Sequence, residues 1–452
     1  MASPDTIAAI ASAHGRGAVG VIRVSGPKVP QIAAAILGAL PKPRRAQLAY
    51  FLDGSGASLD QGLALYFPAP ASYTGEHVLE LQGHGGALIV DVLLKRLLDL
   101  GCRMARPGEF SERAFLNGKM DVAQAEAVAD LIDAGTAAAA RAAVRTLRGE
   151  FSSRIKELQA QITELRKLIE AAIDFPDEEL DFVSGNAVRA HFAAVFAAFD
   201  SITAAARQGA LLRDGLNVVI AGPPNAGKSS LLNRLVGDEV AIVAALPGTT
   251  RDVLRQHVHL DGLPVNLIDT AGLRVAADVV EAEGVRRAKS ELERADRVLY
   301  MVDAAAAAGA STFDPAAELQ QLPPRVPVTL VFNKIDLTAS PPHIDGSGVQ
   351  PRIFLSAKTG AGLPLLRAHL KETAGYQENE SGALSARRRH LDALRRARRA
   401  VEDAAASLAA TRAFELVAED LRLAQLALGE ITGEFSSDDL LGEIFSSFCI
   451  GK

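Results

Sequence analysis

The spacing of apolar residues changes along the chain, and each change marks a different kind of element. Residues 1–118 hold short β-rich runs, such as GAVGVIRVSG and GLALYFPAP, and one strongly helical stretch, ALIVDVLLKRLLDLG. Strand-length runs beside a helical period predict a compact α+β domain in this part of the chain.

Two later regions, residues 119–210 and 377–452, are largely helical in texture. Apolar residues recur there at steps of three and four: Ile155, Leu158, Ile162, Leu165, Leu168 and Ala172 in the first region, and Val417, Leu421, Ala424, Leu428 and Ile431 in the second. Such a stripe predicts an amphipathic helix that must bury one face against a partner. We therefore predict one helical domain built from two chain segments.

The intervening residues 211–376 alternate apolar runs of strand length with helical stretches. The runs are NVVIAG, VNLIDTAG, RVLYMVDAA, VPVTLVFNKIDL and PRIFLSA. This alternation is typical of a parallel sheet with helices on both faces. The sequence thus predicts a multidomain α+β and α/β chain, with the α/β domain inserted into the helical domain.

The end of the chain reads SSDDLLGEIFSSFCIGK. Leu441, Ile444 and Phe448 follow helical steps, so the spacing predicts a terminal helix capped by Ser437 and ended by Gly451. Cys449 would fall in its last turn. A small buried thiol that fills space is the simplest interpretation of this cysteine.

Length and charge agree with this division. At about 150 residues per domain, 452 residues correspond to roughly three domains. With 48 basic and 54 acidic residues the net charge is −6, which excludes a bulk cationic field for nucleic acid or anionic lipid. Any RNA contact must be local; the stretch ARRRHLDALRRARRA is a candidate, although the solvated face of a helix is the simpler interpretation.

Targeting and redox signals are absent from this sequence. Two cysteines cannot form a disulfide framework, the first residues lack a basic region followed by an apolar core, and no apolar run reaches about 18 residues. We expect a cytoplasmic protein with reduced thiols.

The stretch NVVIAGPPNAGKSSLLN carries the strongest chemical signal. Gly222, four further residues, then Gly227 and Lys228 follow a predicted strand and open a predicted helix. Glycines let the backbone wrap a phosphate, the helix N-terminus faces the anion, the lysine reaches the terminal phosphates, and a serine hydroxyl ligates Mg²⁺. We assign nucleotide binding to Asn225, Ala226, Gly227, Lys228, Ser229 and Ser230, with Ser229 as a Mg²⁺ ligand.

Three downstream motifs exclude an ordinary glycine-rich loop. Asp269, Thr270, Ala271 and Gly272 suit a Mg²⁺-linked carboxylate and an N–H facing the γ-phosphate. In Asn333-Lys334-Ile335-Asp336, the Asp336 carboxylate can accept from guanine N1–H and N2–H₂, which adenine lacks. Ser356, Ala357 and Lys358 can offer a backbone N–H to guanine O6. The order of these motifs predicts GTP binding.

The hydrolytic residues are not the usual ones. Leu273 occupies the position where many small GTPases carry a water-orienting glutamine, so another residue must orient the water. Arg251 and Arg274 lie in segments that could supply an arginine finger, although a surface or structural role explains each more simply.

The motifs GPPNAGKSSLLN, PGTTRD, DTAGLR, NKID and SAK resemble those of translation-factor-related GTPases, which include the Era and Der types. The flanking stretches decide among these. GRGAVGVIRVSG, YTGE followed by HGG, ARPGEFSERAFLNGKMDVAQAEAVADLI and the terminal CIGK are similar to the bacterial tRNA-modification GTPases of the MnmE (TrmE) family. The resemblance runs from about residue 6 to residue 452.

The resemblance implies a hydrolytic mechanism in which K⁺ replaces an arginine finger when the G domains dimerise. It assigns K⁺ to Asn225, Thr249 and the carbonyls of Ala244 and Leu246, the second Mg²⁺ contact to Thr250, and orientation of the water to Glu281. Ala245, Pro247 and Gly248 complete the nucleotide-binding loop. Ala244-Ala245 departs from the family's usual Thr-Asp, which puts side-chain support of that loop in doubt. No cysteine precedes the HGG, and His77 replaces a usual acid.

The resemblance also implies a role in modification of the wobble uridine, U34, of certain tRNAs. The family works with an FAD-dependent partner, MnmG (GidA), in a heterotetramer and adds an aminomethyl or carboxymethylaminomethyl group at C5. The carbon comes from 5,10-methylene- or 5-formyl-tetrahydrofolate, which is bound by the N-terminal dimerisation domain. Matching positions for folate are Arg23, Glu80, Lys119 and Lys452, and Cys449 could take part in the chemistry across the dimer interface.

Two other classes of function remain open at this point. An Era-type ribosome-assembly GTPase would be an RNA-binding switch and would need an RNA module, yet no GXXG loop stands in a suitable setting outside the nucleotide site. A membrane-associated GTPase is disfavoured because lipidation signals are absent.

Overall fold

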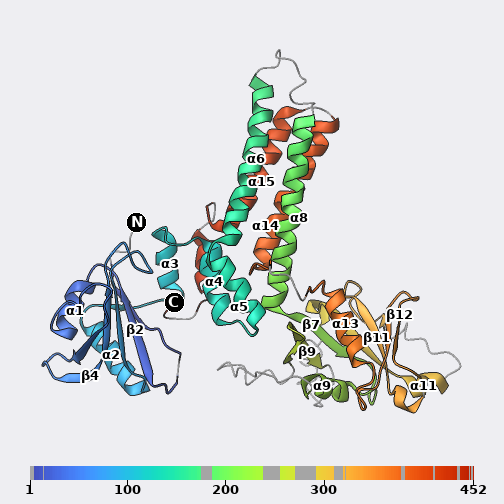
Figure 1. Cartoon of the computed structure of the whole chain (residues 1–452), viewed down its shortest axis with the longest axis horizontal. Helices are drawn as coiled ribbons and strands as arrows, with labels where there is room; N and C mark the ends of the chain where they lie inside the picture. The colour runs from blue at the N-terminus through green and yellow to red at the C-terminus, as the bar shows by residue number, and fades with distance from the viewer. Residues whose placement is uncertain are drawn as a thin grey trace, which may run out of the picture. The chain divides into compact units, whose positions relative to one another are not determined.

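The computed structural model describes residues 5–13, 15–174, 186–237, 255–269, 292–309, 319–320, 322–338, 340–377, 382–410, 413–434, 438–446, 448 and 451. The chain divides into two compact units (Figure 1). The first comprises Met1–Ile132, Val144–Ile202 and Arg389–Lys452, and the second comprises Asp133–Ala143 and Thr203–Arg388.

The N-terminal part of the first unit is built on a six-stranded sheet in the order β3-β4-β5-β2-β1-β6. Its strands are β1 (Ile7–Ile10), β2 (Val19–Ser25), β3 (Gln47–Leu52), β4 (Ser58–Phe67), β5 (Val78–His84) and β6 (Arg103–Met104). Neighbouring strands are antiparallel except β1 and β6. The predicted α+β domain is thus present.

The two faces of this sheet are covered by different helices. Alternate residues, such as Ile22 and Leu81, form one core with α1 (Val29–Leu37) and α2 (Ala87–Asp99). On the opposite face, Ile7 and Ala9 pack against Phe110 of α3 (Glu109–Leu116). The two-residue alternation of a strand therefore divides β1 between two cores.

The helical part of the first unit is formed by two chain segments that lie before and after the parallel sheet in the sequence. Its helices are α4 (Val122–Ile132), α5 (Ala137–Leu147), α6 (Glu150–Asp174), α8 (Asn186–Asp214), α14 (Arg388–Ala410), α15 (Phe414–Thr432) and α16 (Asp438–Ser446), of which α5 and α8 continue into the second unit. Helix α6 packs along α15, and α6, α8, α14 and α15 run alongside one another in Figure 1. The predicted discontinuous helical domain is confirmed.

The predicted apolar stripes are largely buried. Every member of the α15 stripe is buried, and in α6 the stripe is buried from Ile155 to Leu165. Leu168, however, is 37% exposed, and Ile169 is buried in its place. A step of four after Leu165 keeps the side chain on the contact face, because a helix turns once in 3.6 residues.

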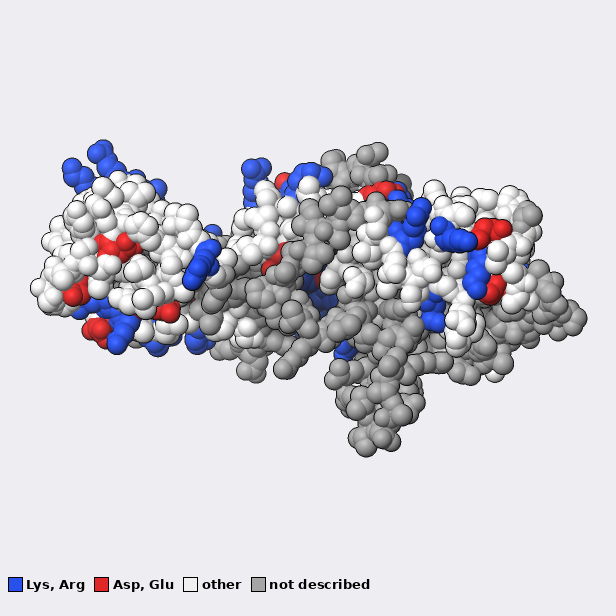
Figure 2. All heavy atoms as spheres, turned by 90° about the horizontal axis from the view of Figure 1, so that it is seen from below, with Lys and Arg blue, Asp and Glu red and all other residues white. Residues whose placement is uncertain are grey.

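The arginines of α14 are paired with carboxylates. Arg395 and Arg396 contact Asp392, Arg396 also contacts Glu430, Arg398 contacts Asp200 and Glu402, and Arg399 contacts Asp403. Figure 2 shows basic and acidic side chains in small groups, with no broad patch of one sign among the described residues on that face. These contacts fit an ion-paired, solvated helix face.

The second unit is a doubly covered parallel sheet. Its seven strands run in the order β12-β13-β11-β10-β7-β9-β8, with antiparallel pairs only at the two edges. They are β7 (Leu216–Ala221), β8 (Arg255–Leu260), β9 (Leu263–Asp269), β10 (Arg297–Asp303), β11 (Val328–Asn333), β12 (His343–Asp345) and β13 (Arg352–Phe354). Helices α9 (Lys228–Gly237) and α13 (Leu363–Thr373) cover one face, and the other holds a separate core that includes Ala304 of α11 (Ala304–Gly309).

A buried ionic cluster joins three helices of the first unit. The Glu126 carboxylate on α4, whose side chain is 2% exposed, lies 2.7 Å from Arg389 and 2.9 Å from His390 on α14. Arg389 also donates to the carbonyls of Glu430 and Ile431 on α15. Although burial opposes ionisation, the contacts with His390 and with the Arg389 guanidinium hold the pKa of Glu126 well below its usual range.

Removing this carboxylate should destabilise the first unit strongly. We expect Glu126→Gln to lower the free energy of unfolding by about 3 to 5 kcal/mol, because it leaves Arg389 without its buried counter-ion. Glu419→Gln, which breaks the exposed pair with Arg422 on α15, is the matched control and should leave the urea midpoint unchanged. Equal midpoints for the two variants would contradict the prediction.

A buried histidine should make the second unit sensitive to acid. His369 on α13 contacts the Thr329 hydroxyl, which also accepts from Arg297, and burial followed by the Arg297 cation lowers the pKa of His369. The unfolded chain therefore binds more protons than the folded unit below pH ~6.5, so stability should fall as pH drops from that value toward the folded pKa. His369→Gln should flatten this slope in urea unfolding between pH 7.5 and 5.5; an unaltered slope would assign the sensitivity to other groups.

Candidate functional site

The phosphate loop joins β7 to α9, as the sequence predicts. Gly222 has a φ of 132° and Gly227 a φ of 96°, and a Cβ at Gly227 would lie 2.2 Å from the Asn333 amide nitrogen. Asn225 adopts a left-handed φ of 62°. Glycine is required at both tight positions, and the loop leads directly into the N-terminus of α9.

Lys228 and Ser229 lie in the first turn of α9. The Lys228 ammonium donates to the carbonyls of Gly222 (3.0 Å) and Pro223 (2.9 Å), so it lies across the loop. Ser230 is the next residue of the helix. The roles predicted for Lys228 at the terminal phosphates and for the Ser229 hydroxyl at a metal ion stay predictions.

The base-binding motifs converge on the same end of the sheet. Asn333 ends β11; its amide nitrogen donates to the Ala226 carbonyl (2.9 Å), and its amide oxygen accepts from the Ala357 N–H (2.9 Å). The Ser356 hydroxyl donates to Asp336 at 2.5 Å. Asn333 thus ties the phosphate loop to the segment Ser356–Lys358. Because the Ala357 N–H is engaged by Asn333, it is not a spare donor for guanine O6.

Several predicted residues of this site lie outside the described part of the chain. Asp269 ends β9, where its backbone is the register partner of Ile220 in the strand that leads into the phosphate loop. Its side chain, and all of Ala244–Thr250, Arg251, Thr270–Arg274 and Glu281, are not described. Among the residues that the structure describes, no group of three His, Cys, Asp or Glu could hold a metal.

In the N-terminal domain, Arg23 and Glu80 are register partners on β2 and β5. Both the Nε and an Nη nitrogen of Arg23 lie 2.9 Å from one Glu80 oxygen. The Arg23 guanidinium also lies 5.3 Å from the centre of the Tyr73 ring and 5.8 Å from that of Phe110. The resemblance implied Arg23 and Glu80 as folate positions, but it indicated neither their ionic pair nor the two aromatic rings, which come from a loop and from α3.

Lys119 follows α3 and contacts the loop between β4 and β5 that carries Tyr73. Its ammonium donates to the Pro70 carbonyl (3.1 Å), and Asn117 donates to the Thr74 carbonyl (2.8 Å). These contacts hold the loop against the end of α3, and the Tyr73 hydroxyl meets Ser111 at 2.9 Å. Lys119 therefore belongs to the same region as Arg23, although no direct contact joins Lys119 to the Arg23–Glu80 pair in the described geometry.

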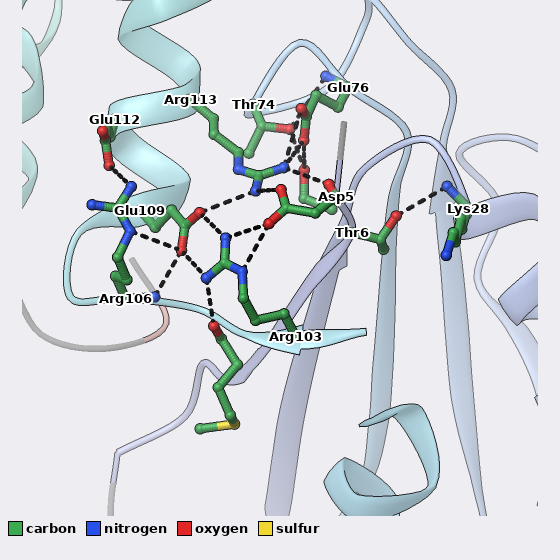
Figure 3. A network of polar contacts seen from close by, with 12 residues as sticks. Asp5, Thr6, Lys28, Thr74, Glu76, Arg103, Arg106, Glu109, Glu112 and Arg113 are labelled. Carbon is green, nitrogen blue, oxygen red and sulfur yellow. Dashed lines mark hydrogen bonds and ion pairs between the residues drawn. The ribbon is translucent and has the colours of Figure 1, made fainter. Parts of the chain in front are cut away.

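A buried ionic network holds α3 and this loop in place (Figure 3). Arg113, whose side chain is 4% exposed, contacts Glu76, Glu109 and Asp5. Arg103 contacts the same Asp5 and Glu109 from β6. Because Arg113, Glu76 and Glu109 are buried together, the position of α3, and with it that of Phe110, is fixed relative to the sheet.

Near the end of the chain, Gly451 packs closely against the backbone of the N-terminal domain. Helix α16 ends at Ser446, so the prediction of a helix reaching Gly451 was wrong. Gly451 has a φ of 98°, and a Cβ there would lie 2.2 Å from the Ile10 carbonyl at the end of β1. The preceding residue in β1, Ala9, is the register partner of Arg23. Ser437, Cys449 and Lys452 lie outside the described residues.

Within the described part of the chain, no helix combines the length and apolar character needed to span a membrane.

Comparison with known families matches both ends of the chain. The model described as "GTP-binding protein TrmE N-terminus" matches residues 6–119, and the model of the MnmE helical domain matches residues 122–449. The Era protein of Aquifex aeolicus, a solved structure, is 28% identical over 41% of this chain and 66% of its own, with a TM-score of 0.26.

Curated relatives match over their full length. The tRNA modification GTPases MnmE of Proteus mirabilis and Sodalis glossinidius are each 56% identical to this chain, over 454 and 457 residues, and the alignments cover 100% of every chain involved. The MnmE of Yersinia pseudotuberculosis is also 56% identical, over 459 residues. On this full-length identity, and as the sequence motifs predicted, the chain belongs to the MnmE (TrmE) family of tRNA modification GTPases.

Proposed function

We propose that this chain is a K⁺-stimulated GTPase that helps to build the modified wobble uridine of certain tRNAs. In this proposal an FAD-dependent partner of the MnmG (GidA) type and a tetrahydrofolate one-carbon unit take part in adding an aminomethyl or carboxymethylaminomethyl group to C5 of U34. The family itself hydrolyses GTP in tRNA modification. The observation that carries the proposal is that Asn333 connects the phosphate loop to the base-binding segment. The match of the N-terminal domain to the TrmE model disfavours the alternative, an Era-type switch.

In the nucleotide site, each described residue has a physical task. Lys228 and the α9 N-terminus neutralise phosphate charge, Asp336 accepts from the guanine edge, and Ser229 would hold Mg²⁺. Mg²⁺, when bound, would supply charge neutralisation at the nucleotide phosphates.

For K⁺ we propose the side-chain oxygen of Asn225, Thr249 and the carbonyls of Ala244 and Leu246, with Thr250 on Mg²⁺ and Glu281 orienting the water. The described member, Asn225, is held in a left-handed conformation within the phosphate loop, where an amide oxygen is a suitable ligand for a hard cation. K⁺, when bound, would supply the charge that an arginine finger supplies elsewhere.

For tetrahydrofolate we propose Arg23, Glu80, Lys119 and Lys452, with Cys449 near the one-carbon unit. A carboxylate can grip the amino-pyrimidine edge of a pterin, aromatic rings can flank it, and cations suit the glutamate tail. Glu80 is paired with Arg23, whose guanidinium lies over Tyr73 and Phe110, and Lys119 contacts the loop that carries Tyr73, so this region offers such a set of groups.

We further propose a homodimer formed through the N-terminal domain, with G domains that dimerise transiently. Leu48 and Tyr50 on the edge strand β3 are 66% and 57% exposed, and Leu63, the register partner of Leu48, is 40% exposed. An exposed apolar group on a sheet edge is typical of a surface that another chain covers.

Potassium dependence is the first test. GTP turnover should be at least severalfold faster in KCl than in NaCl. Asn225→Ala should remove most of this difference but should still bind GTP. The measurement is steady-state hydrolysis at equal ionic strength. Equal rates in the two salts for the unsubstituted protein would refute the proposed K⁺ site.

Folate binding tests the N-terminal site separately. Glu80→Gln preserves size but loses the charge of the carboxylate, so we expect a roughly 10- to 100-fold weaker affinity for 5-formyl-tetrahydrofolate by calorimetry, with GTP hydrolysis retained. Glu112→Gln, which alters only the contact of Glu112 on α3 with the exposed Arg106, is the control and should bind as the original chain does. Unchanged affinity in Glu80→Gln would remove Glu80 from the site.

A further inference from the structure

We propose that Asp303 is a positioning residue of the guanine-nucleotide site and that it acts by holding Lys334. Asp303 ends β10 and is the register partner of Asn333, which ends the neighbouring strand β11. One Asp303 oxygen lies 2.6 Å from the Lys334 ammonium. The proposal rests on GTP binding alone and does not depend on K⁺, folate or a partner protein.

Lys334 is held in an unusual backbone conformation. Its φ of 68° is left-handed, which is rare for a residue other than glycine, asparagine or aspartate. The residue lies between two members of the base site, Asn333 and Asp336, and its carbonyl accepts from the Leu337 N–H at 3.0 Å. This conformation accompanies a side chain that reaches the end of β10.

The carboxylate that receives Lys334 is itself fixed. The second oxygen of Asp303 accepts from the N–H groups of Ala305 (3.0 Å) and Ala306 (3.3 Å), in the first turn of α11. The Lys334 hydrogen bond, helped by these two N–H groups, lowers the pKa of Asp303 and keeps it ionised. Asp303 thus has two tasks, and each of its oxygens serves a different one.

A fixed lysine is useful next to a bound purine. Asp336 can select the guanine edge, but the ring also needs a surface on its face, and the four-carbon stem of a lysine can provide one. A stem anchored at its ammonium end loses little rotamer freedom when the ring binds, whereas an unanchored stem loses more. Asp303 would therefore raise nucleotide affinity without touching the nucleotide.

Asp303→Asn separates the two tasks of this residue. The amide oxygen of asparagine can still accept from Ala305 and Ala306, but the charge that holds Lys334 is lost. In the full-length chain we expect GDP and GTP to dissociate about 5- to 20-fold faster, and KM for GTP to rise accordingly, while kcat at saturating GTP changes less than twofold.

The matched control is another ion pair of the same unit. Lys371 on α13 contacts Asp261 at 2.8 Å, away from the base motifs, so Asp261→Asn should leave nucleotide affinity and KM unchanged. Lys334→Met retains an apolar stem but not the charge. If Asp303 acts through Lys334, the double variant Asp303→Asn/Lys334→Met should bind nucleotide no more weakly than Lys334→Met alone.

Three results would overturn the proposal. The first is unchanged nucleotide dissociation in Asp303→Asn. The second is simple addition of the two effects in the double variant. The third is that Asp303→Asn lowers the melting temperature of the nucleotide-free protein but leaves its affinity for nucleotide unchanged. That result would mean that Asp303 only caps the start of α11. Loss of K⁺ stimulation or of folate binding would not bear on it.

Discussion

The nucleotide site depends on one buried side-chain amide. Asn333 donates to the phosphate loop and accepts from the segment after β13, so its two polar ends fix two loops that are distant in sequence. The close approach of its nitrogen to Gly227 leaves no room for a side chain there. The glycine of the phosphate motif is therefore required by a residue of the base motif as well as by the phosphate. A buried amide satisfied at both ends positions its partners closely, because any shift would leave a polar group unpaired.

The N-terminal domain uses buried charge for the same purpose. Arg113 is surrounded by carboxylates from the first residues, from the loop after β4 and from α3 itself. Burying such groups adds little net stability, since desolvation offsets most of their attraction, but a misplaced partner would be costly. The network thus specifies where α3 lies, and α3 in turn brings Phe110 to the guanidinium of Arg23.

The C-terminal segment is joined to the N-terminal part by close backbone contacts. A Cβ at Gly108 would lie 2.4 Å from the Phe445 carbonyl, and one at Gly451 would lie 2.2 Å from that of Ile10. Phe445 and Phe448 add an apolar contact with Val122 of α4. The two ends of the chain therefore meet in one unit, next to the strand that carries Arg23.

The sequence by itself determined the features that local spacing encodes. The phosphate loop, the NKID and SAK motifs and the amphipathic stripes each lie within a short stretch, where backbone geometry alone relates residues to one another. The tertiary structure decided which distant residues meet: Tyr73 and Phe110 with Arg23, Asp303 with Lys334, and Gly451 with Ile10. It also decided that Ile169 rather than Leu168 is buried and that the last helix ends at Ser446. Strand register and helix docking set these contacts, and both depend on the packing of the whole unit, so no local pattern could report them.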